Sequence, residues 1–388
     1  MSSWRSWVQV GWALAYVVAC GCAGRVGSLP PPEDGGAGAA VDGSAGRAGT
    51  GGRAAAGSGG LGGAAGAAAG RGGSAAGGSS PGTRSTYYVQ DGALFDTCGE
   101  KVILRGVNHP TLYVDRAGEA LTEIAKTGAN SVRLFWFATH DIPISEAEDA
   151  IAKAIEEQMI PILEMHDSTC MWSLSPIAEY WTSDAAVALI KRYEKHLIVN
   201  IANEASADSG STFRAEYSAI IKRMRAAGIH VPLMIDGSRC GRDYEVLLSQ
   251  GKALLDADPD RNLIFSAHLY DPMPSSQLAS VYEEFAEAKL TFVVGEFANK
   301  SPPGCGAPLS YGALIEQAEK HGVGWLAWSW GNDDPGSDWN TDCGEFDMTT
   351  TFAFDSLEGW GEEVAVSHPA SIQNTSKRPA SLTGGACR

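Results

Sequence analysis

Several features that mark well-known classes of protein are missing from this 388-residue chain. Its glycine-rich stretch has no strict three-residue period, which excludes a collagen-like triple helix. The sequence contains no CxxC pair and no histidine-rich spacing, so we expect no zinc or other metal site. No glycine-rich fingerprint follows the first candidate strand, which argues against a dinucleotide-binding fold.

The chain also lacks a basic excess, since its formal net charge is -17. Only six of the 29 basic and three of the 46 acidic residues precede residue 85, so the remainder carries a net charge of -20. An acidic domain repels nucleic acids and acidic polysaccharides. We therefore expect no nucleic-acid partner, and a neutral polymer fits the charge better.

The N-terminal apolar stretch, residues 7–19, is too short to span a bilayer comfortably. It follows Arg5, so we interpret residues 1–20 as a signal peptide that exports the chain. The four residues VVAC, which end at Cys20, resemble a bacterial lipobox and predict lipidation of Cys20. The alternative is ordinary cleavage, with Cys20 and Cys22 merely adjacent. We expect an extracellular or cell-surface location, with a lipid anchor in the outer membrane as the membrane contact.

Residues 21–84 are dominated by Gly, Ala and Ser. Such a segment buries too little apolar surface to offset the entropy of ordering, so we expect a disordered linker. Residues 85–388 number 304, enough for one large core, and we expect a single catalytic domain that acts as a monomer.

Eight short runs rich in Val, Ile, Leu and Phe are typical of buried strands, with 27 to 36 residues between successive starts. Each interval holds one strand, one helix and two loops, which predicts a (β/α)8 TIM barrel. Ser145 with Glu148 predicts a capping box, and residues 310–321 predict a helix that ends at Gly322. The alternatives are a doubly wound open sheet or seven strands. The runs begin near residues 102, 129, 161, 197, 231, 263, 291 and 324.

Polar residues gather where these runs end. Glu204 and Glu296 each close an apolar run, and a carboxylate there is costly unless it reaches a polar cleft. In a TIM barrel the C-terminal ends of all eight strands meet at one face, where catalysis takes place. The other polar and aromatic strand ends are Arg133, His166, Asp167, Asn203, Asp236, His268, Tyr270, Trp328 and Trp330.

Six cysteines follow the linker, and an even number in an exported chain indicates three disulfides with fifteen possible pairings. In a barrel the loops after the seventh and eighth strands are neighbours, which favours Cys305–Cys343. A hairpin beneath the barrel and the C-terminal tail would bring Cys98 to Cys387. Elimination then leaves Cys170 with Cys240.

Six motifs in this order resemble glycoside hydrolase family 5: RGVNH at 105–109, VR at 132–133, NE at 203–204, HLY at 268–270, GEF at 295–297 and WSW at 328–330. The segments around His166, Glu204 and Trp330 are most similar to bacterial endo-β-1,4-mannanases. Ala205 stands where that family commonly has a bulky aromatic residue, and an endo-β-1,4-glucanase on the same scaffold is the alternative. The resemblance implies mannan, glucomannan or β-glucan, all neutral plant polysaccharides, as the substrate.

The resemblance also implies roles for individual residues. Glu204 would be the general acid/base and Glu296 the nucleophile, and Asn203 would hold the sugar 2-hydroxyl. Arg133 and Tyr270 would keep Glu296 ionised. The remaining residues expected to contact the sugar are His166 and His268 in a polar floor, Trp328 as a platform, and Trp330, Asn108 and His109.

This chemistry needs no cofactor. A retaining glycosidase places two carboxyl groups about 5 Å apart, one protonated and one ionised. We expect Arg133 and Tyr270 to lower the pKa of Glu296, whereas burial and the charge on Glu296 should raise the pKa of Glu204. Trp330 is as well explained by core packing, and both histidines could be core residues. A surface lipoprotein that binds carbohydrate without cleaving it is an alternative of another class.

Overall fold

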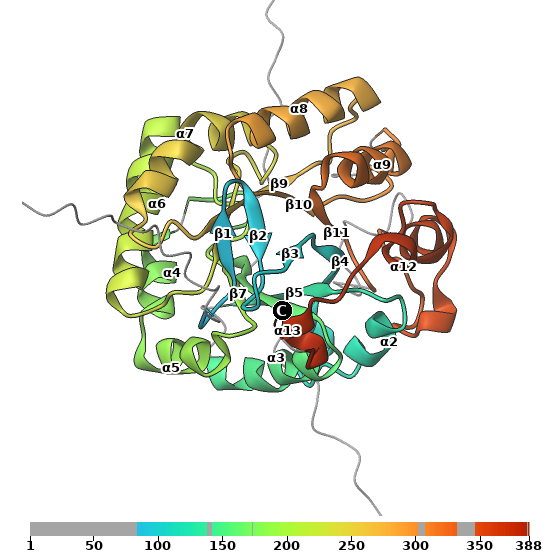
Figure 1. Cartoon of the computed structure of the whole chain (residues 1–388), viewed down its shortest axis with the longest axis horizontal. Helices are drawn as coiled ribbons and strands as arrows, with labels where there is room; N and C mark the ends of the chain where they lie inside the picture. Colours follow the sequence, from blue (N-terminus) through green and yellow to red (C-terminus); the bar gives the residue numbers. More distant parts are fainter. Residues whose placement is uncertain are drawn as a thin grey trace, which may run out of the picture. The chain divides into compact units, whose positions relative to one another are not determined.

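Eight parallel strands close into a barrel in the computed structural model, which describes residues 84–137, 142–172, 174–301, 307–331, 346–385 and 387 (Figure 1). The predicted TIM barrel is therefore confirmed, and the open-sheet and seven-strand alternatives are wrong. Around the barrel the strand order is β4-β5-β6-β7-β8-β9-β10-β11. These strands are β4 (Arg105–His109), β5 (Ser131–Trp136), β6 (Ile160–Met165), β7 (Ile198–Asn200), β8 (Leu233–Asp236), β9 (Leu263–His268), β10 (Phe292–Glu296) and β11 (Gly324–Ala327).

Helices lie on the outside of the barrel and connect its strands (Figure 1). In the part of the chain that the structure describes, no helix is long and apolar enough to cross a membrane. The helices are α1 (Thr111–Val114), α2 (Leu121–Ala125), α3 (Ala147–Glu156), α4 (Leu174–Trp181), α5 (Asp184–Tyr193), α6 (Gly210–Ala226), α7 (Tyr244–Ala257), α8 (Ser275–Glu287), α9 (Tyr311–His321), α11 (Gly359–Glu362), α12 (Ile372–Thr375) and α13 (Ala380–Thr383).

Two predicted helix ends have different outcomes. The capping box at Ser145 is wrong, because Ser145 lies inside a 3-10 turn, Ile144–Glu146, and no side chain caps α3. The end of α9 is confirmed, since Gly322 has a φ of +66°, a left-handed conformation that glycine adopts without steric cost.

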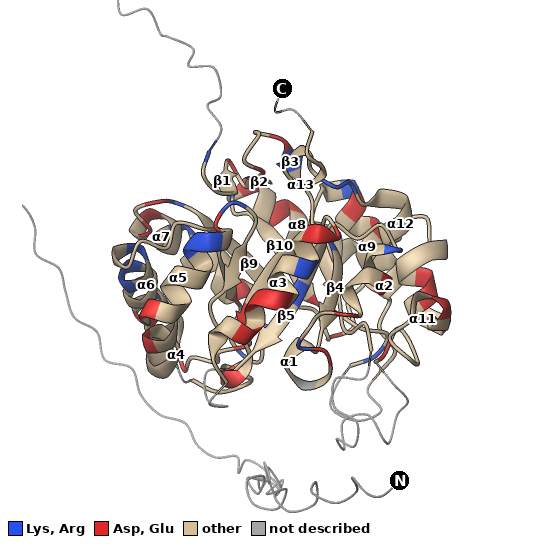
Figure 2. Ribbon diagram, turned by 90° about the horizontal axis from the view of Figure 1, so that it is seen from below, with Lys and Arg blue, Asp and Glu red and all other residues tan. Residues whose placement is uncertain are grey.

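A small antiparallel sheet covers the N-terminal end of the barrel. It consists of β1 (Tyr88–Gln90), β2 (Ala93–Phe95) and β3 (Lys101–Val102), and with α13 it lies at one end of the molecule (Figure 2). The first barrel strand therefore begins at Arg105 rather than near residue 102, because Val102 pairs with β2 instead.

Two of the predicted disulfides are present. Cys98, between β2 and β3, is bonded to Cys387. Cys170 is bonded to Cys240. Cys305 and Cys343 lie outside the described residues, as do Cys20 and residues 21–83 of the predicted linker, so those predictions stay untested.

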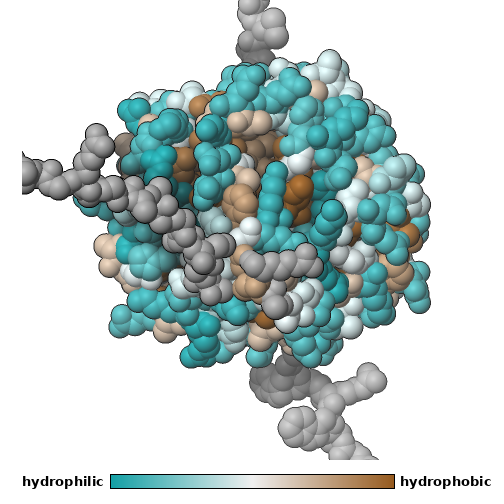
Figure 3. Space-filling view, viewed as in Figure 1, coloured by the Kyte–Doolittle hydropathy of each residue, from teal (hydrophilic) through white to brown (hydrophobic). Residues whose placement is uncertain are grey.

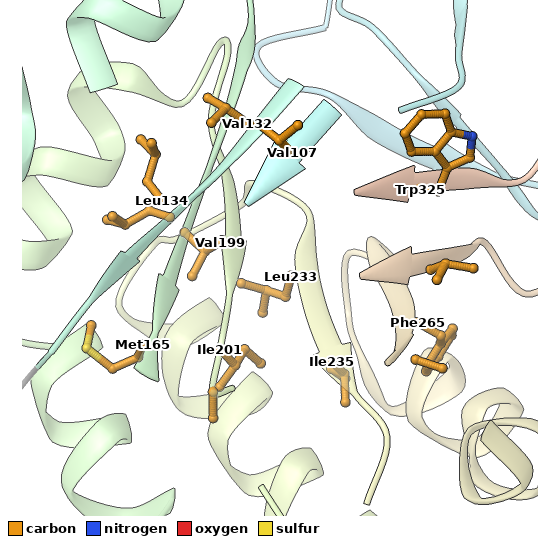
Figure 4. Packing of buried hydrophobic residues seen from close by; sticks show 14 of the residues in the cluster. Val107, Val132, Leu134, Met165, Val199, Ile201, Leu233, Ile235, Phe265 and Trp325 are labelled. Carbon is orange, nitrogen blue, oxygen red and sulfur yellow. The ribbon is translucent and has the colours of Figure 1, made fainter. Parts of the chain in front are cut away.

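The barrel lies between two apolar layers, one outside and one inside its strands. Outward side chains such as Val132 and Leu134 on β5 and Ile235 on β8 pack in the layer between the strands and the helices (Figure 4). Inward aliphatic side chains such as Ile162 and Met234 form a second cluster, together with residues of the small sheet. Seen from the end that carries the small sheet, the surface is mostly hydrophilic, with apolar residues in scattered patches (Figure 3). The interior of the barrel is thus apolar at its N-terminal end.

Candidate active site

The inward face of the barrel changes from apolar to polar towards the C-terminal ends of the strands. On β6 the inward residues Ile160 and Ile162 precede Glu164, and on β9 Ile264 precedes His268. Glu164 and His268 are both fully buried. Because side chains alternate across a strand, the same two-residue period that builds the core also builds this polar layer.

A bulge in β10 turns Glu296 into the polar layer. The pairing register with β9 shifts between Val294 and Glu296, so Gly295 is an extra residue in that strand. A Cβ at Gly295 would overlap the hydroxyl of Ser266, which leaves glycine as the residue that fits. The bulge therefore depends on this glycine and directs the glutamate that follows it.

The two glutamates singled out by the sequence meet at this end of the barrel. One carboxylate oxygen of Glu204, one of Glu296 and a ring nitrogen of His268 all lie within 4.8 Å of one another. Nδ1 of His268 is 2.8 Å from Oε1 of Glu204 and 3.3 Å from Oε2 of Glu296. The predicted closeness of the two carboxyl groups is confirmed, and it matches the short separation that retention of configuration requires.

Both oxygens of Glu296 accept hydrogen bonds from the predicted partners. Nη1 of Arg133 donates to Oε1 over 2.8 Å, and the Tyr270 hydroxyl donates to Oε2 over 2.9 Å. The predicted fall in the pKa of Glu296 is wrong. Burial raises this pKa above the ordinary 4.5, and the nearby Glu204 adds to the rise. The positive charges of His268 and Arg133 lower the pKa but do not offset the rise.

Arg133 is the centre of the network beneath the carboxyl groups. Its side chain is fully buried, and burial alone would favour its neutral form, but the surrounding carboxylates hold its pKa above the ordinary range. Its removal would take a shared cationic partner from several buried acids. Besides Glu296 it contacts Asn108 Oδ1 at 2.9 Å, Asn203 Oδ1 at 2.7 Å, Asn200 Oδ1 at 2.8 Å, Asp236 Oδ2 at 3.3 Å and Glu164 Oε2 at 3.8 Å.

Asp236 and His268 form a second buried ion pair below Glu204. Burial opposes both charges, yet the charges of Glu296 and Asp236 raise the pKa of His268 to about 10, and those of His268 and Arg133 lower the pKa of Asp236 to about 2. Oδ2 of Asp236 also accepts the backbone N–H of Glu204 over 3.2 Å. Glu204 has a left-handed φ of +52°, which is unusual for a residue with a side chain, and this hydrogen bond helps to hold it.

An aromatic stack forms one wall of the site. The half-buried ring of Trp328 lies 5.1 Å from Phe135 and 5.9 Å from His166, with interplanar angles of 12° and 15°. Nδ1 of His166 is held by Oε1 of Glu164 at 2.7 Å. Stacking on both rings fixes the plane of Trp328, as a platform for a sugar ring requires.

Three of the predicted sugar contacts have fully buried side chains that are hydrogen-bonded within the protein, so their contact with a sugar stays a prediction. Trp330 packs in the core and donates its indole N–H to the carbonyl of Phe352 over 2.8 Å. Nε2 of His109 is bonded to Oδ2 of Asp115 at 2.8 Å. Asn108 holds the backbone carbonyl of Gly295 over 3.0 Å and the guanidinium of Arg133, so it supports the site from below.

Several residues of the site were missed by sequence reasoning. Asn200 bonds Arg133, Phe135 stacks on Trp328, and Thr169 accepts from Asn203 over 2.9 Å. The two-residue period identifies the first two, since Asn200 follows inward-facing Ile198 and Phe135 follows Arg133. The Thr169 contact comes from a loop, for which the sequence carries no such signal.

Two groupings among the described residues contain three side chains of metal-ligating type. In the first, Glu204 lies beside Cys170 and Cys240, whose sulfurs are joined in a disulfide and offer no thiolate. In the second, the ring of His268 contacts a carboxylate oxygen of both Glu204 and Glu296. The expectation that the protein uses no metal or cofactor stays a prediction.

A family model described as "Cellulase (glycosyl hydrolase family 5)" matches residues 95–334. The chain belongs to this family. Membership in family 5 confirms the predicted family and the assignment as a glycoside hydrolase.

Curated relatives in family 5 resemble most of the chain. A mannan endo-1,4-beta-mannosidase of Cellvibrio japonicus is 33% identical over 315 residues, which cover 77% of this chain and 70% of the relative. A mannan endo-1,4-beta-mannosidase of Salipaludibacillus agaradhaerens is 30% identical over 306 residues, covering 75% and 94%. The structure of a Thermomonospora fusca beta-mannanase in its mannotriose complex has a TM-score of 0.69 and 26% identity, covering 77% of this chain and 100% of that one.

Proposed function

We propose that this family 5 enzyme is a retaining endo-β-1,4-mannanase in which Glu296 is the nucleophile and Glu204 the general acid/base. The observation that carries the proposal is the carboxyl pair within 4.8 Å, held by one shared histidine. Both oxygens of Glu296 accept hydrogen bonds from buried donors, which suits an ionised nucleophile. Oε1 of Glu204 faces His268, whereas Oε2 faces the Cys170–Cys240 disulfide, whose sulfurs have no proton to donate, so Oε2 can carry the proton.

The reaction proceeds in two displacements. First, a carboxylate oxygen of Glu296 attacks the anomeric carbon while Glu204 gives its proton to the glycosidic oxygen. The C–O bond to the leaving sugar breaks, and a covalent glycosyl ester forms. Then Glu204, now ionised, removes a proton from water as the water oxygen attacks the same carbon. The ester breaks, Glu296 is regenerated, and the configuration is retained.

The buried cations prepare this site for the transition state. Arg133 and the protonated His268 lie within hydrogen-bonding reach of the two carboxyl groups, so the site needs little reorganisation when charge moves between them. Tyr270 donates to the second oxygen of Glu296 and fixes its orientation. These contacts agree with the supporting roles proposed for Arg133, Tyr270 and His268. The contact of Asn203 with a sugar 2-hydroxyl stays a prediction.

Mannan is supported as the substrate by the two curated relatives named above, both mannan endo-1,4-beta-mannosidases that align with three quarters or more of this chain. The aromatic platform of Trp328, backed by Phe135 and His166, suits the C–H face of a neutral sugar. The acidic balance of the chain also favours an uncharged polysaccharide.

An assay of reducing ends released from galactomannan, glucomannan and carboxymethylcellulose tests the proposal. We expect mannan-type polymers to be cut faster than carboxymethylcellulose, and Glu204→Gln and Glu296→Gln to abolish cleavage without unfolding the chain. Faster cleavage of carboxymethylcellulose would favour an endo-β-1,4-glucanase. Full activity of either variant would overturn the assigned roles, and binding without product would indicate a carbohydrate-binding lipoprotein.

We also propose that the protein is exported and anchored by a lipid on Cys20. Two disulfides among the described residues support export, because disulfides persist in oxidising compartments. Metabolic labelling with palmitate and membrane fractionation of the full chain and of Cys20→Ala test the anchor. Labelling that persists in Cys20→Ala would contradict it.

A further inference from the structure

The Cys170–Cys240 disulfide crosses the end of the strand that leads to Glu204. Cys170 lies in the connection after β6, and Cys240 lies in the connection after β8. In the barrel β7 is paired between these two strands, and Glu204 follows it. The bridge therefore links the loops on either side of the proposed acid/base.

The disulfide also touches the carboxyl group itself. The sulfur of Cys170 lies 3.6 Å from Oε2 of Glu204, and the sulfur of Cys240 belongs to the same grouping, within 4.8 Å. A disulfide sulfur carries no proton, so it can accept a hydrogen bond but cannot donate one. Oε1 is already bound by His268 at 2.8 Å. The carboxyl group is thus held between the histidine on one side and the disulfide on the other.

Backbone contacts join the same three loops. The N–H of Ser206 donates to the carbonyl of Met171 over 3.1 Å, and the N–H of Cys240 donates to the Ser206 hydroxyl over 2.8 Å. Cys170, Glu204 and Cys240 all have left-handed φ values, at +57°, +52° and +56°. Such conformations persist where the surrounding structure enforces them, and here the covalent bridge provides part of that constraint.

We propose that the Cys170–Cys240 disulfide is a positioning device for Glu204, which directs Oε2 towards the glycosidic oxygen of the departing sugar. The proposal rests on the proposed role of Glu204 as acid/base. Cys170 is exposed and Cys240 half-buried, so the bridge borders the open side of the site, where the leaving sugar must pass. No bond of the disulfide changes in the reaction.

A positioning role makes a specific kinetic prediction. A sugar alkoxide is a poor leaving group, so a sugar leaves as an alcohol with a proton from Glu204, whereas dinitrophenolate leaves without one. Displacement of Glu204 should therefore slow the release of a sugar and spare the release of dinitrophenolate. General loss of structure would slow both.

The experiment compares Cys170→Ser/Cys240→Ser with the native chain. We expect kcat/KM on mannohexaose to fall about tenfold, as for a modest displacement of a catalytic group. On 2,4-dinitrophenyl β-mannobioside we expect kcat/KM to change less than about twofold. The matched control is Cys98→Ser/Cys387→Ser, which removes the disulfide at the opposite end of the barrel. It should lower Tm and leave the ratio of the two kcat/KM values unchanged.

Equal losses on both substrates, or no loss on mannohexaose, would overturn the positioning role. A native chain that cleaves neither mannan nor mannohexaose would instead refute the proposed function. If the double variant does not fold, reversible reduction of the native chain, with the free thiols of Cys170 and Cys240 verified by mass spectrometry, gives the same readout. The ratio of kcat/KM on mannohexaose to kcat/KM on the dinitrophenyl substrate should then fall on reduction and recover on reoxidation.

Discussion

The two ends of the barrel use buried charge in different ways. At the N-terminal end, Arg105 is buried but pairs with a half-exposed Glu319 and two backbone carbonyls. At the C-terminal end, Arg133 is surrounded by buried carboxylates of Glu164, Asp236 and Glu296. Burying so many charges is expensive, and an apolar layer of similar volume would often be equally stable or more so. This unfavourable burial of charge lies at the proposed catalytic carboxyl groups, which fits a network kept for catalysis.

The disulfides follow the same division. Cys98–Cys387 ties the small sheet to the tail after α13, and the bridge lies far from the carboxyl pair along the barrel. Cys170–Cys240 touches Glu204. One bridge closes the domain and the other borders the site.

The largest effect should come from removing the proposed nucleophile. Glu296→Gln should lower kcat on galactomannan by about 10⁴-fold or more, since loss of a nucleophile removes the covalent route. The change keeps the size of the side chain, so Tm should shift only slightly. The matched control is Glu287→Gln on the exposed surface of α8, which should leave both quantities unchanged.

Replacing Arg133 and Arg105 in turn tests the contrast between the C-terminal and N-terminal ends of the barrel directly. Arg133→Met should destabilise the chain by about 3–5 kcal/mol, because three buried carboxylates lose a shared cationic partner and keep only histidines as counter-charges. Arg105→Met should cost about 1–3 kcal/mol, as Glu319 can be solvated and only carbonyl partners are lost. Urea unfolding at pH 7 measures both. Equal losses of free energy of unfolding in the two variants would mean that the buried charges at the C-terminal end depend on their arginine no more than those at the N-terminal end.

The pH dependence of activity should reflect the buried position of Glu296. This side chain must be ionised to attack, and burial raises its pKa above 4.5. The acid limb of kcat/KM for the free enzyme should therefore lie above pH 4.5, with about a tenfold fall for each pH unit below it. A profile that stays flat down to pH 4 would contradict the raised pKa.

The smallest effect is expected from replacing the two tryptophans that follow β11, which should differ in their influence on KM. Trp328→Ala removes the stacked platform and should raise KM for mannohexaose about five- to tenfold, in line with about 1 kcal/mol for an aromatic stacking contact. Trp330→Phe, in the core, should lower Tm and leave KM unchanged. A raised KM for Trp330→Phe, together with an unchanged KM for Trp328→Ala, would favour Trp330 as the sugar contact.

Much of this architecture could be predicted from the sequence because it depends on short-range pattern. Buried strands appear as apolar runs, and an acid that closes such a run, as Glu204 and Glu296 do, marks the C-terminal face. The first strand was misplaced because Lys101–Val102 pairs in the small sheet, a choice made by contacts distant in sequence.

What sequence reasoning missed also has a physical cause. The pKa of Glu296 is the net result of burial and four neighbouring charges, and only coordinates give their distances. His109 was expected at the site, yet Asp115 in the next loop holds its ring. The Ser145 capping box failed because a 3-10 turn occupies that position.

The most direct test is to identify the residue that forms the covalent intermediate. The native chain would be incubated with 2,4-dinitrophenyl 2-deoxy-2-fluoro-β-mannoside, digested, and analysed by peptide mass spectrometry. We predict one glycosyl adduct, carried by Glu296. An adduct on any other residue, Glu204 included, would contradict the account.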